Sequence, residues 1–444
     1  MIVTLIRCCG ASLLAAGILA TLWAPGWAAG ASFLPLDKMP EPMEGAWRLG
    51  PLRVRPLLQL RDLGYDSNVF LSEEGQEEGD FTCRLAGGLR GQVLFGNRGV
   101  VGFEADSEYV AFATTSSQNY LNGMVDARGD LVLHRLSLFA GGHWSSSMER
   151  ATSEFDERTR LRFASAFAGA GWRTSNRTSV AGSVSEQQYR YSDADVPGLD
   201  ESLNRTERTL AVRGVYRAFA RSSVFIELSR SRMLFDDGPE EADPQSSAQT
   251  YSRDSEQRSF MPGISFDPTA PVSGGLKAGR AVFDATDQGK PDFRGLLGEA
   301  EVAFRLSDRW RLAGTWERDV SFSIFENNLY FEQRRRGAKF ERSLGDRYAL
   351  EAGGEFEQLD WPERDTSALP GQFTDNGEPV RTCDLTGLDC SILRRDTIRS
   401  YFIGGRMRVW RRSDLSVRLG YRHRSSNIPG ESDRQVLLTT GTGF

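Results

Sequence analysis

Histidine, lysine and cysteine are scarce in this chain, and long apolar runs are absent beyond its N-terminus. The sequence has 3 histidines, 5 cysteines and only 4 lysines. No P-loop, H-E-x-x-H or C-x-x-C motif occurs, so the common nucleotide, zinc-protease and thiol-redox sites have no basis in the sequence. No run of 18 apolar residues follows the N-terminal region, which excludes a bundle of membrane-spanning helices.

Arginine makes up almost all of the basic residues. Of 54 lysines and arginines, 50 are arginine, while the formal net charge is −6. Such mild acidity does not suggest a nucleic-acid binder, so we expect no nucleic-acid partner. The arginine excess has two interpretations that stay open. It reflects GC-rich codon usage, or it supplies guanidinium forks that line a pore and hold carboxylate or phosphate groups.

Residues 1–31 have the pattern of a secretory signal peptide. A single positive charge, Arg7, precedes an apolar stretch, and Ala29-Gly30-Ala31 is a small-x-small cleavage site. The short, proline-containing stretch 32–50 is predicted to be a periplasmic N-terminal segment. Residues 51–444 are then the folded part of the mature chain.

From about Leu52 to Phe444 the chain repeats short segments that are apolar at every second position. This period of two places the apolar side chains on one face of a β-strand. Residues 328–342 alternate poorly, and Pro262 interrupts another segment. Clear apolar sets, each interleaved with mostly polar residues, are Val101, Phe103, Ala105 and Tyr109; Leu210, Val212 and Tyr216; and Leu415, Val417, Leu419 and Tyr421.

The connections between these segments alternate between tight turns and long polar loops. A barrel in an outer membrane has this arrangement, with short turns on the periplasmic side and long loops outside the cell. We therefore predict an all-β fold, a transmembrane antiparallel up-and-down β-barrel of about 18 strands (16–18). A ring of this size is wide enough to enclose an aqueous lumen.

The last segment carries Val436, Leu438, Thr440 and Thr442 at alternate positions and ends on Phe444. This ending looks like the signal read by the insertion machinery for outer-membrane barrels in Gram-negative bacteria. We therefore expect the protein in the outer membrane of a Gram-negative bacterium. Its first partners would be the barrel insertion machinery and outer-membrane lipid.

The stretch Gly64-Tyr65-Asp66-Ser67-Asn68-Val69-Phe70 follows the first segment. It resembles the family described as putative outer-membrane β-barrel porin type 2, whose members often accompany exopolysaccharide systems. The resemblance implies a barrel over the whole mature chain and a role in moving secreted polysaccharide. A periplasmic polysaccharide co-polymerase or export protein is then a candidate partner.

Residue chemistry alone suggests a local role for the same stretch. Asp66 and Asn68 can cap a turn through side-chain to backbone bonds. A calcium loop would not form, because Phe70 and Leu71 occupy the places of an oxygen ligand and the turn glycine. Looser cation binding by the glutamates that follow stays open.

The histidines and thiols do not suggest catalysis or metal binding. His134 lies in a predicted turn and His423 faces outward, which leaves only His143 pointing into the lumen. A Ser-His-Asp site needs an activated serine beside the base, and no G-x-S-x-G motif is present. Cys383 and Cys390 have no histidine near them in the sequence, so these two thiols make a poor zinc site. We expect no catalytic residue, no metal and no cofactor.

Charged residues at the polar positions are candidates for lining and selectivity of the lumen. The acidic and basic segments are expected to form opposed walls, which would orient charged solutes; Arg160 and Arg162 belong to one basic segment. The alternative is simple pairing between neighbouring strands. The main candidates are Arg406, Arg408, Arg418, Arg422, Arg213, Arg217, Glu104, Asp106, Glu108, Glu351, Glu355 and Glu357. Repulsion within the first four favours a binding or conducting role.

The longest loop, 361–393, is a candidate gate. Cys383 and Cys390 lie within it, and their close spacing suggests a local disulfide in an oxidising compartment. A surface loop pinned by that disulfide is the alternative to a gate. Cys83 is left over, and its fate is open.

The functional hypothesis that follows is a conduit for export of secreted exopolysaccharide or capsule. The alternatives are a general or substrate-selective uptake porin, and a surface barrel with a closed lumen.

Overall fold

The computed structural model describes residue 43 and residues 46–150, 158–192, 203–236, 253–286, 292–323, 328–364, 368–373, 379–381, 393–410, 413–428 and 432–443. These residues form β-strands and one short 3-10 helix, η1 (Ser116–Gln118). Within these ranges, no helix is long and apolar enough to cross a membrane.

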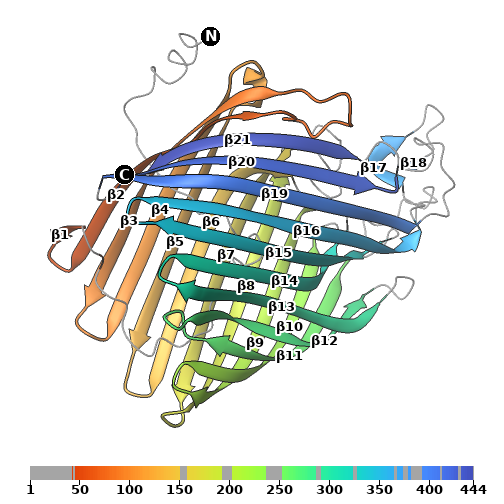
Figure 1. The fold of residues 1–444 in the computed structure, drawn as a ribbon. Coiled ribbons are helices and arrows are strands. Elements are labelled where there is room, and N and C mark those ends of the chain that lie inside the picture. Colours follow the sequence, from red (N-terminus) through yellow and green to blue (C-terminus); the bar gives the residue numbers. More distant parts are fainter. Residues whose placement is uncertain are drawn as a thin grey trace.

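A closed barrel of 18 antiparallel strands makes up the molecule (Figure 1). Each strand pairs with its neighbours in sequence, and the first long strand pairs with the last. The strands are β2 (Leu52–Asp66), β3 (Asp80–Phe95), β4 (Gly99–Phe112), β5 (Tyr120–Val132), β6 (Leu136–Arg150), β7 (Arg158–Arg173), β8 (Thr178–Ser192), β9 (Arg205–Phe219), β10 (Ser222–Phe235), β11 (Ser255–Phe266), β12 (Val272–Ala285), β13 (Phe293–Ser307), β14 (Trp310–Phe322), β15 (Tyr330–Leu344), β16 (Tyr348–Arg364), β19 (Leu393–Trp410), β20 (Ser413–Ser426) and β21 (Asp433–Gly443).

Three short strands lie outside this count. β1 (Trp47–Leu49) folds back on the start of β2, so the segment predicted as a periplasmic lead-in already contributes to the sheet. β17 (Ala368–Phe373) and β18 (Pro379–Arg381) form a separate hairpin in the long connection between β16 and β19. The predicted barrel and its strand number are confirmed.

The outer wall is apolar in the alternating pattern that the sequence predicts. Along β9, Leu210 and Val212 are 53% and 42% exposed, whereas Ala211 between them is 4% exposed. Leu415, Val417, Leu419 and Tyr421 are likewise exposed on β20. Exposed apolar side chains in this register face lipid, and the intervening residues face the lumen.

Both segments that the sequence left doubtful are strands. The poorly alternating residues belong to β15, which pairs over its whole length with β14 and β16. Pro262 lies in β11 and aligns with Ile226 of β10. It has no N–H to donate, and the assigned pairing of β11 with β12 skips it. Pairing with two neighbours thus overrides a weak local pattern.

The Gly64–Phe70 stretch joins the first strand to the last. Asp66 Oδ1 accepts the Asn68 N–H at 2.9 Å, as the predicted turn requires. The Gln435 amide of β21 donates to both Asp66 oxygens at 2.8 and 2.9 Å. Asn68 is fully buried and donates from Nδ2 to the Arg434 carbonyl at 3.0 Å. The motif therefore caps a turn and holds the barrel closed.

Candidate functional site

The inward face of the barrel carries the charged residues that the sequence singled out. The strand alternation places all twelve of them on the lumen side, interleaved with exposed apolar neighbours such as Tyr109, Tyr348 and Val417. The acidic and basic residues do not form opposed walls, however. Eleven of the twelve pair with opposite charges on strands that are adjacent or two apart.

Arg61 illustrates this pairing. Its guanidinium donates to Asp106 at 2.7 Å and to Glu108 at 2.5 Å, across two strands. Arg335 similarly reaches Glu355 and Glu357 at 3.3 Å each. Further pairs with predicted members are Arg90–Glu104, Arg213–Glu227, Lys339–Glu351, Arg418–Glu351, Arg422–Asp433, Arg406–Glu341 and Arg408–Asp414.

The four arginines of β19 and β20 are therefore not a patch of uncompensated charge. Each has a carboxylate within ion-pair distance, from β15 to Arg406, from β16 to Arg418, and from β20 and β21 to the other two. Cross-strand pairing, the alternative stated above, accounts for these contacts. Sequence reasoning could not see this, because Glu341, Asp414 and Asp433 become neighbours only through the register.

Apolar side chains from opposite walls belong to one cluster at the outer end of the lumen. Leu161 and Tyr191 come from β7 and β8, and Leu359, Trp361 and Ile398 come from β16 and β19. β7 and β16 lie nine places apart in the ring of 18 strands, so they face each other. Yet these residues belong to one buried cluster, in which each side chain is at most 8% exposed. The walls thus meet where the strands reach the long loops.

An arginine lies within this outer layer. The Arg205 guanidinium is 3.8 Å from the centre of the Tyr189 ring and 4.0 Å from that of Phe322. Tyr189 is on the adjacent strand β8, whereas Phe322 ends β14, five places further around the barrel. Glu207 pairs with Arg205 at 2.8 Å. A cation between two aromatic faces bridges the lumen and is stabilised by both rings.

A buried ion cluster of Arg394, Asp396 and Arg424 also lies at the outer end. Asp396 accepts from Arg424 at 2.7 Å and from Arg394 at 3.2 Å, and Ser426 donates to it at 2.6 Å. The side chains of the two arginines and the aspartate are each at most 1% exposed. The centre of the Trp361 ring lies 4.9 Å from the Arg394 guanidinium carbon. Removing the Asp396 carboxylate would take this partner from both buried cations, which is costly.

The periplasmic mouth is lined differently. Six hairpin turns end on an exposed arginine that immediately precedes the outgoing strand: Arg98, Arg135, Arg177, Arg221, Arg309 and Arg347. We call these the mouth arginines. Each precedes an outward-facing residue, so the alternation places it on the lumen side. Asp308 and Asp346 lie in two of the same turns, and Asp267 lies in the turn between β11 and β12.

The backbone does not require arginine at these positions. Each mouth arginine accepts a backbone hydrogen bond through its carbonyl from the next hairpin, for example from Val132 to Arg98 at 2.7 Å. Pro271 occupies the equivalent place between β11 and β12 and accepts the same bond from Arg305 at 2.7 Å. The recurring backbone bond uses only the carbonyl, so it does not explain why arginine recurs. The guanidinium groups can instead interact with solutes at the mouth.

Other candidate sites do not suggest chemistry. His143 faces the lumen as predicted, with Nδ1 3.7 Å from Asp126. Glu74 and Glu77 bind Arg434 at 2.8 and 2.7 Å. The Glu77 carboxylate accepts hydrogen bonds from its own backbone N–H, from the Gly75 N–H and from Arg434. These bonds lower the pKa of Glu77. Among the described residues, no group of three or more histidines, cysteines and carboxylates could hold a metal.

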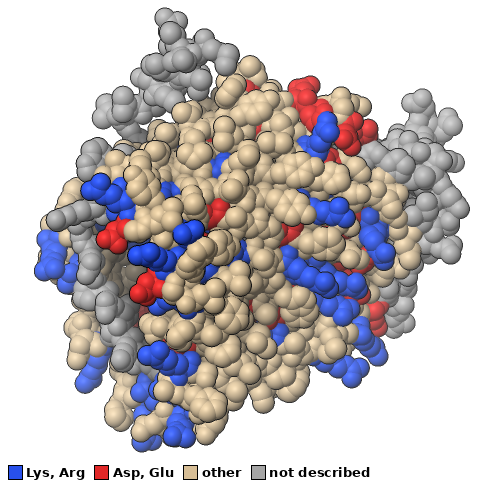
Figure 2. All heavy atoms as spheres, viewed as in Figure 1, with Lys and Arg blue, Asp and Glu red and all other residues tan. Residues whose placement is uncertain are grey.

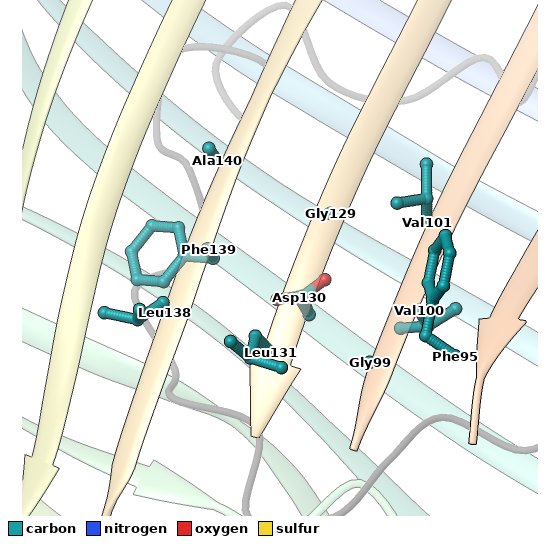
Figure 3. A pocket seen from close by; sticks show the side chains of 10 residues that line it. All are labelled: Phe95, Gly99, Val100, Val101, Gly129, Asp130, Leu131, Leu138, Phe139 and Ala140. Atoms are coloured by element: carbon teal, nitrogen blue, oxygen red, sulfur yellow. The ribbon is translucent and has the colours of Figure 1, made fainter. Parts of the chain in front are cut away.

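A shallow hollow of about 330 Å³ lies over β4, β5 and β6 near their short turns (Figure 3). Gly99 and Gly129 leave it open, and Val101, Leu131 and Leu138 line it together with other mostly apolar residues. Its exposed members belong to the lipid-facing set, so it is not part of the conduit.

The sequence model of the family described as "Putative beta-barrel porin 2" matches residues 45–369, which is most of the chain. The chain belongs to this family. The family description names a porin, and this porin is a β-barrel of the Gram-negative outer membrane. The resemblance inferred from Gly64–Phe70 is thereby confirmed.

Solved structures are similar to this chain over 88% of its length. OpdK of Pseudomonas aeruginosa is 10% identical, with 88% of this chain and 98% of that chain covered and a TM-score of 0.44. OccAB3 of Acinetobacter baumannii is 9% identical, with 88% and 99% covered and a TM-score of 0.46. No curated protein matches the sequence.

Several predicted features lie outside the described residues. These are the signal peptide, Phe444, and the Cys383–Cys390 disulfide. Of the candidate gate 361–393, the backbone is described at its two ends and in β17 and β18.

Proposed function

We propose that this porin is an uptake channel for small solutes, narrowed at its outer end by side chains that meet across the lumen. The observation that supports this is the single buried cluster shared by β7, β8, β16 and β19, with Arg205 held between Tyr189 and Phe322. Close-packed side chains leave little room for a polymer. Small solutes need only local rotamer changes in this layer, whereas a polysaccharide needs the walls to separate.

Single-channel conductance of the mature chain in a planar bilayer tests the proposal. Phe322→Ala removes one face of the Arg205 contact, so we expect conductance to rise. Phe356→Ala is the matched control, because Phe356 faces lipid on β16 and is 37% exposed. It should leave conductance unchanged.

Two outcomes would contradict the proposal. A wild-type channel that an acidic polysaccharide enters and blocks would favour the export conduit expected from the family resemblance. No conductance from the wild type or from Phe322→Ala would favour a closed structural barrel.

A further inference from the structure

The outer wall changes from apolar to basic toward the long loops. On β13, outward residues are apolar up to Leu296, and the next outward position is Arg294. On β14 and β19, Trp316 and Tyr401 are likewise followed by Arg318 and Arg399. In each case the change lies toward the long-loop end of the strand, because Arg294 stands near the start of β13, Arg318 near the end of β14 and Arg399 in the first half of β19.

We define the outer arginine belt as Arg294, Arg318, Arg334, Arg336, Arg395 and Arg399, on β13, β14, β15 and β19. Figure 2 shows basic side chains gathered on the right-hand part of this face, over the ends of these strands that lead to the long loops. Arg160 and Arg162 of β7 also fall in the outward register. The prediction that they face the lumen is therefore wrong.

Among the described residues, acidic side chains on the same surface only partly neutralise the belt. Glu332 pairs with Arg318 at 2.9 Å and Arg334 at 3.2 Å. Asp360 pairs with Arg395 at 2.5 Å and Arg334 at 3.6 Å. Asp284 and Asp292 lie near Arg294 at 3.9 and 3.4 Å.

Exposure distinguishes the belt from an internal ion-pair network. The side chains of Arg294 and Arg395 are 63% and 65% exposed. The same pattern continues on neighbouring strands, where Arg230, Arg232 and Arg258 share the one carboxylate of Glu256. The excess positive charge thus lies on the surface, at the edge of the lipid-facing band.

We propose that the outer arginine belt binds phosphorylated lipid headgroups of the outer leaflet. The belt borders the apolar side chains of the lipid-facing band. One amphipathic lipid can therefore place its phosphorylated headgroup on the belt and its acyl chains on the apolar band. Arginine is suited to phosphate, because its planar fork donates two parallel hydrogen bonds. A second copy of this chain would bring the same positive surface, which disfavours self-association here.

This surface lies on the outer wall and does not depend on conduction. Its position also explains why Arg rather than Lys suits the site, since each guanidinium can bond a carboxylate and a phosphate oxygen at once. Bound headgroups would therefore add to the existing pairs with Glu332 and Asp360.

The test compares lipid binding by the full mature barrel and by a variant with Arg294, Arg336, Arg395 and Arg399 each changed to Gln. The probe is diphosphoryl lipid A in detergent, with its dephosphorylated form alongside. Basic side chains near an anionic headgroup layer strengthen binding, so losing four arginines should weaken binding at least about tenfold. Adding salt should weaken wild-type binding in the same direction.

Two controls make the result specific. Changing Arg135, Arg177, Arg221 and Arg347 to Gln removes the same charge from the periplasmic mouth and should leave lipid A binding unchanged. A variant with the four belt positions changed to Lys keeps the charge and should retain most of the binding, which separates loss of charge from loss of folding.

Four outcomes would overturn the proposal. The first three are equal binding by wild type and the Gln variant, equal binding of the dephosphorylated lipid, and full displacement of lipid A by millimolar inorganic phosphate. The third of these would indicate a site for free phosphate. Binding of an acidic polysaccharide in preference to lipid A would assign the belt to a different partner.

Discussion

At the residue scale, the barrel depends on a few positions where strands approach closely. Gly64 is the clearest, because a Cβ built there would lie 2.0 Å from the Leu438 carbonyl oxygen of β21. Thr440 donates to the Leu63 carbonyl at 2.7 Å in the same place. A side chain at position 64 would have to push the last strand away from the first.

We expect Gly64→Ala to destabilise the folded barrel by about 1–3 kcal/mol, as overpacking does in close-packed regions. Gly102→Ala is the control, since nothing lies within 4 Å of a Cβ there. That change should stay within about 0.5 kcal/mol of wild type. Urea unfolding followed by tryptophan fluorescence measures both, and equal midpoints would contradict the assigned role of Gly64.

At the element scale, the hairpins share one pattern of backbone hydrogen bonds at their short turns, but the side chains at the short-turn end differ from those at the long-loop end. The short turns each use the carbonyl before the outgoing strand to bond the next hairpin, and six of them present an arginine there. Rings of arginine at a pore mouth attract anions. The outer ends instead carry aromatic and paired side chains.

Changing all six mouth arginines to Gln should shift the channel toward cation selectivity. Removing fixed positive charge lowers the local concentration of anions at the mouth. The reversal potential under a KCl gradient measures the shift. Arg336 and Arg399 changed to Gln provide the control, because both face outward. An unchanged reversal potential in the six-residue variant would indicate that the mouth arginines do not influence permeation.

At the scale of the whole molecule, the barrel is asymmetric along its axis. The clusters of buried apolar residues include strand ends and segments at the long loops, such as Leu203, Phe293 and Leu329. The short-turn end carries exposed charged residues instead. The narrowing proposed above would therefore lie toward the extracellular side.

Polyethylene glycol should reveal this asymmetry in an oriented bilayer. Chains small enough to enter from the periplasmic side should reduce the conductance, because they displace ions from the wider mouth. The same chains added on the extracellular side should have a much smaller effect. Equal reduction from both sides would mean that the outer layer does not narrow the channel.

Much of the fold could be predicted from the sequence, because a β-strand alternates faces with a fixed period. The apolar sets on β9 and β20 therefore identified the lipid-facing wall without any knowledge of partners. The cap formed by Asp66 and Asn68 could also be predicted, because it joins residues that are only two apart in the chain. The residues of β15 and the segment around Pro262 in β11 were weakly marked, and pairing with neighbouring strands decided their structure.

The candidate site was predicted less well. The twelve charged residues lie on the lumen side, but which charges neutralise which depends on register and on reach across two strands, as Arg61 shows with Asp106. Arg205, Tyr189 and Phe322 carry no sequence signal, because their contact joins strands on different parts of the ring.

The sequence by itself determined that this protein is a barrel, where its strands lie and which face meets lipid, since these follow from local alternation and turn chemistry. Only the tertiary structure decided that opposite walls touch at the outer end, that the lumen charges are paired, and that a belt of arginine faces outward. Those features arise from contacts between residues far apart in the chain, which only closure and shape of the barrel bring together.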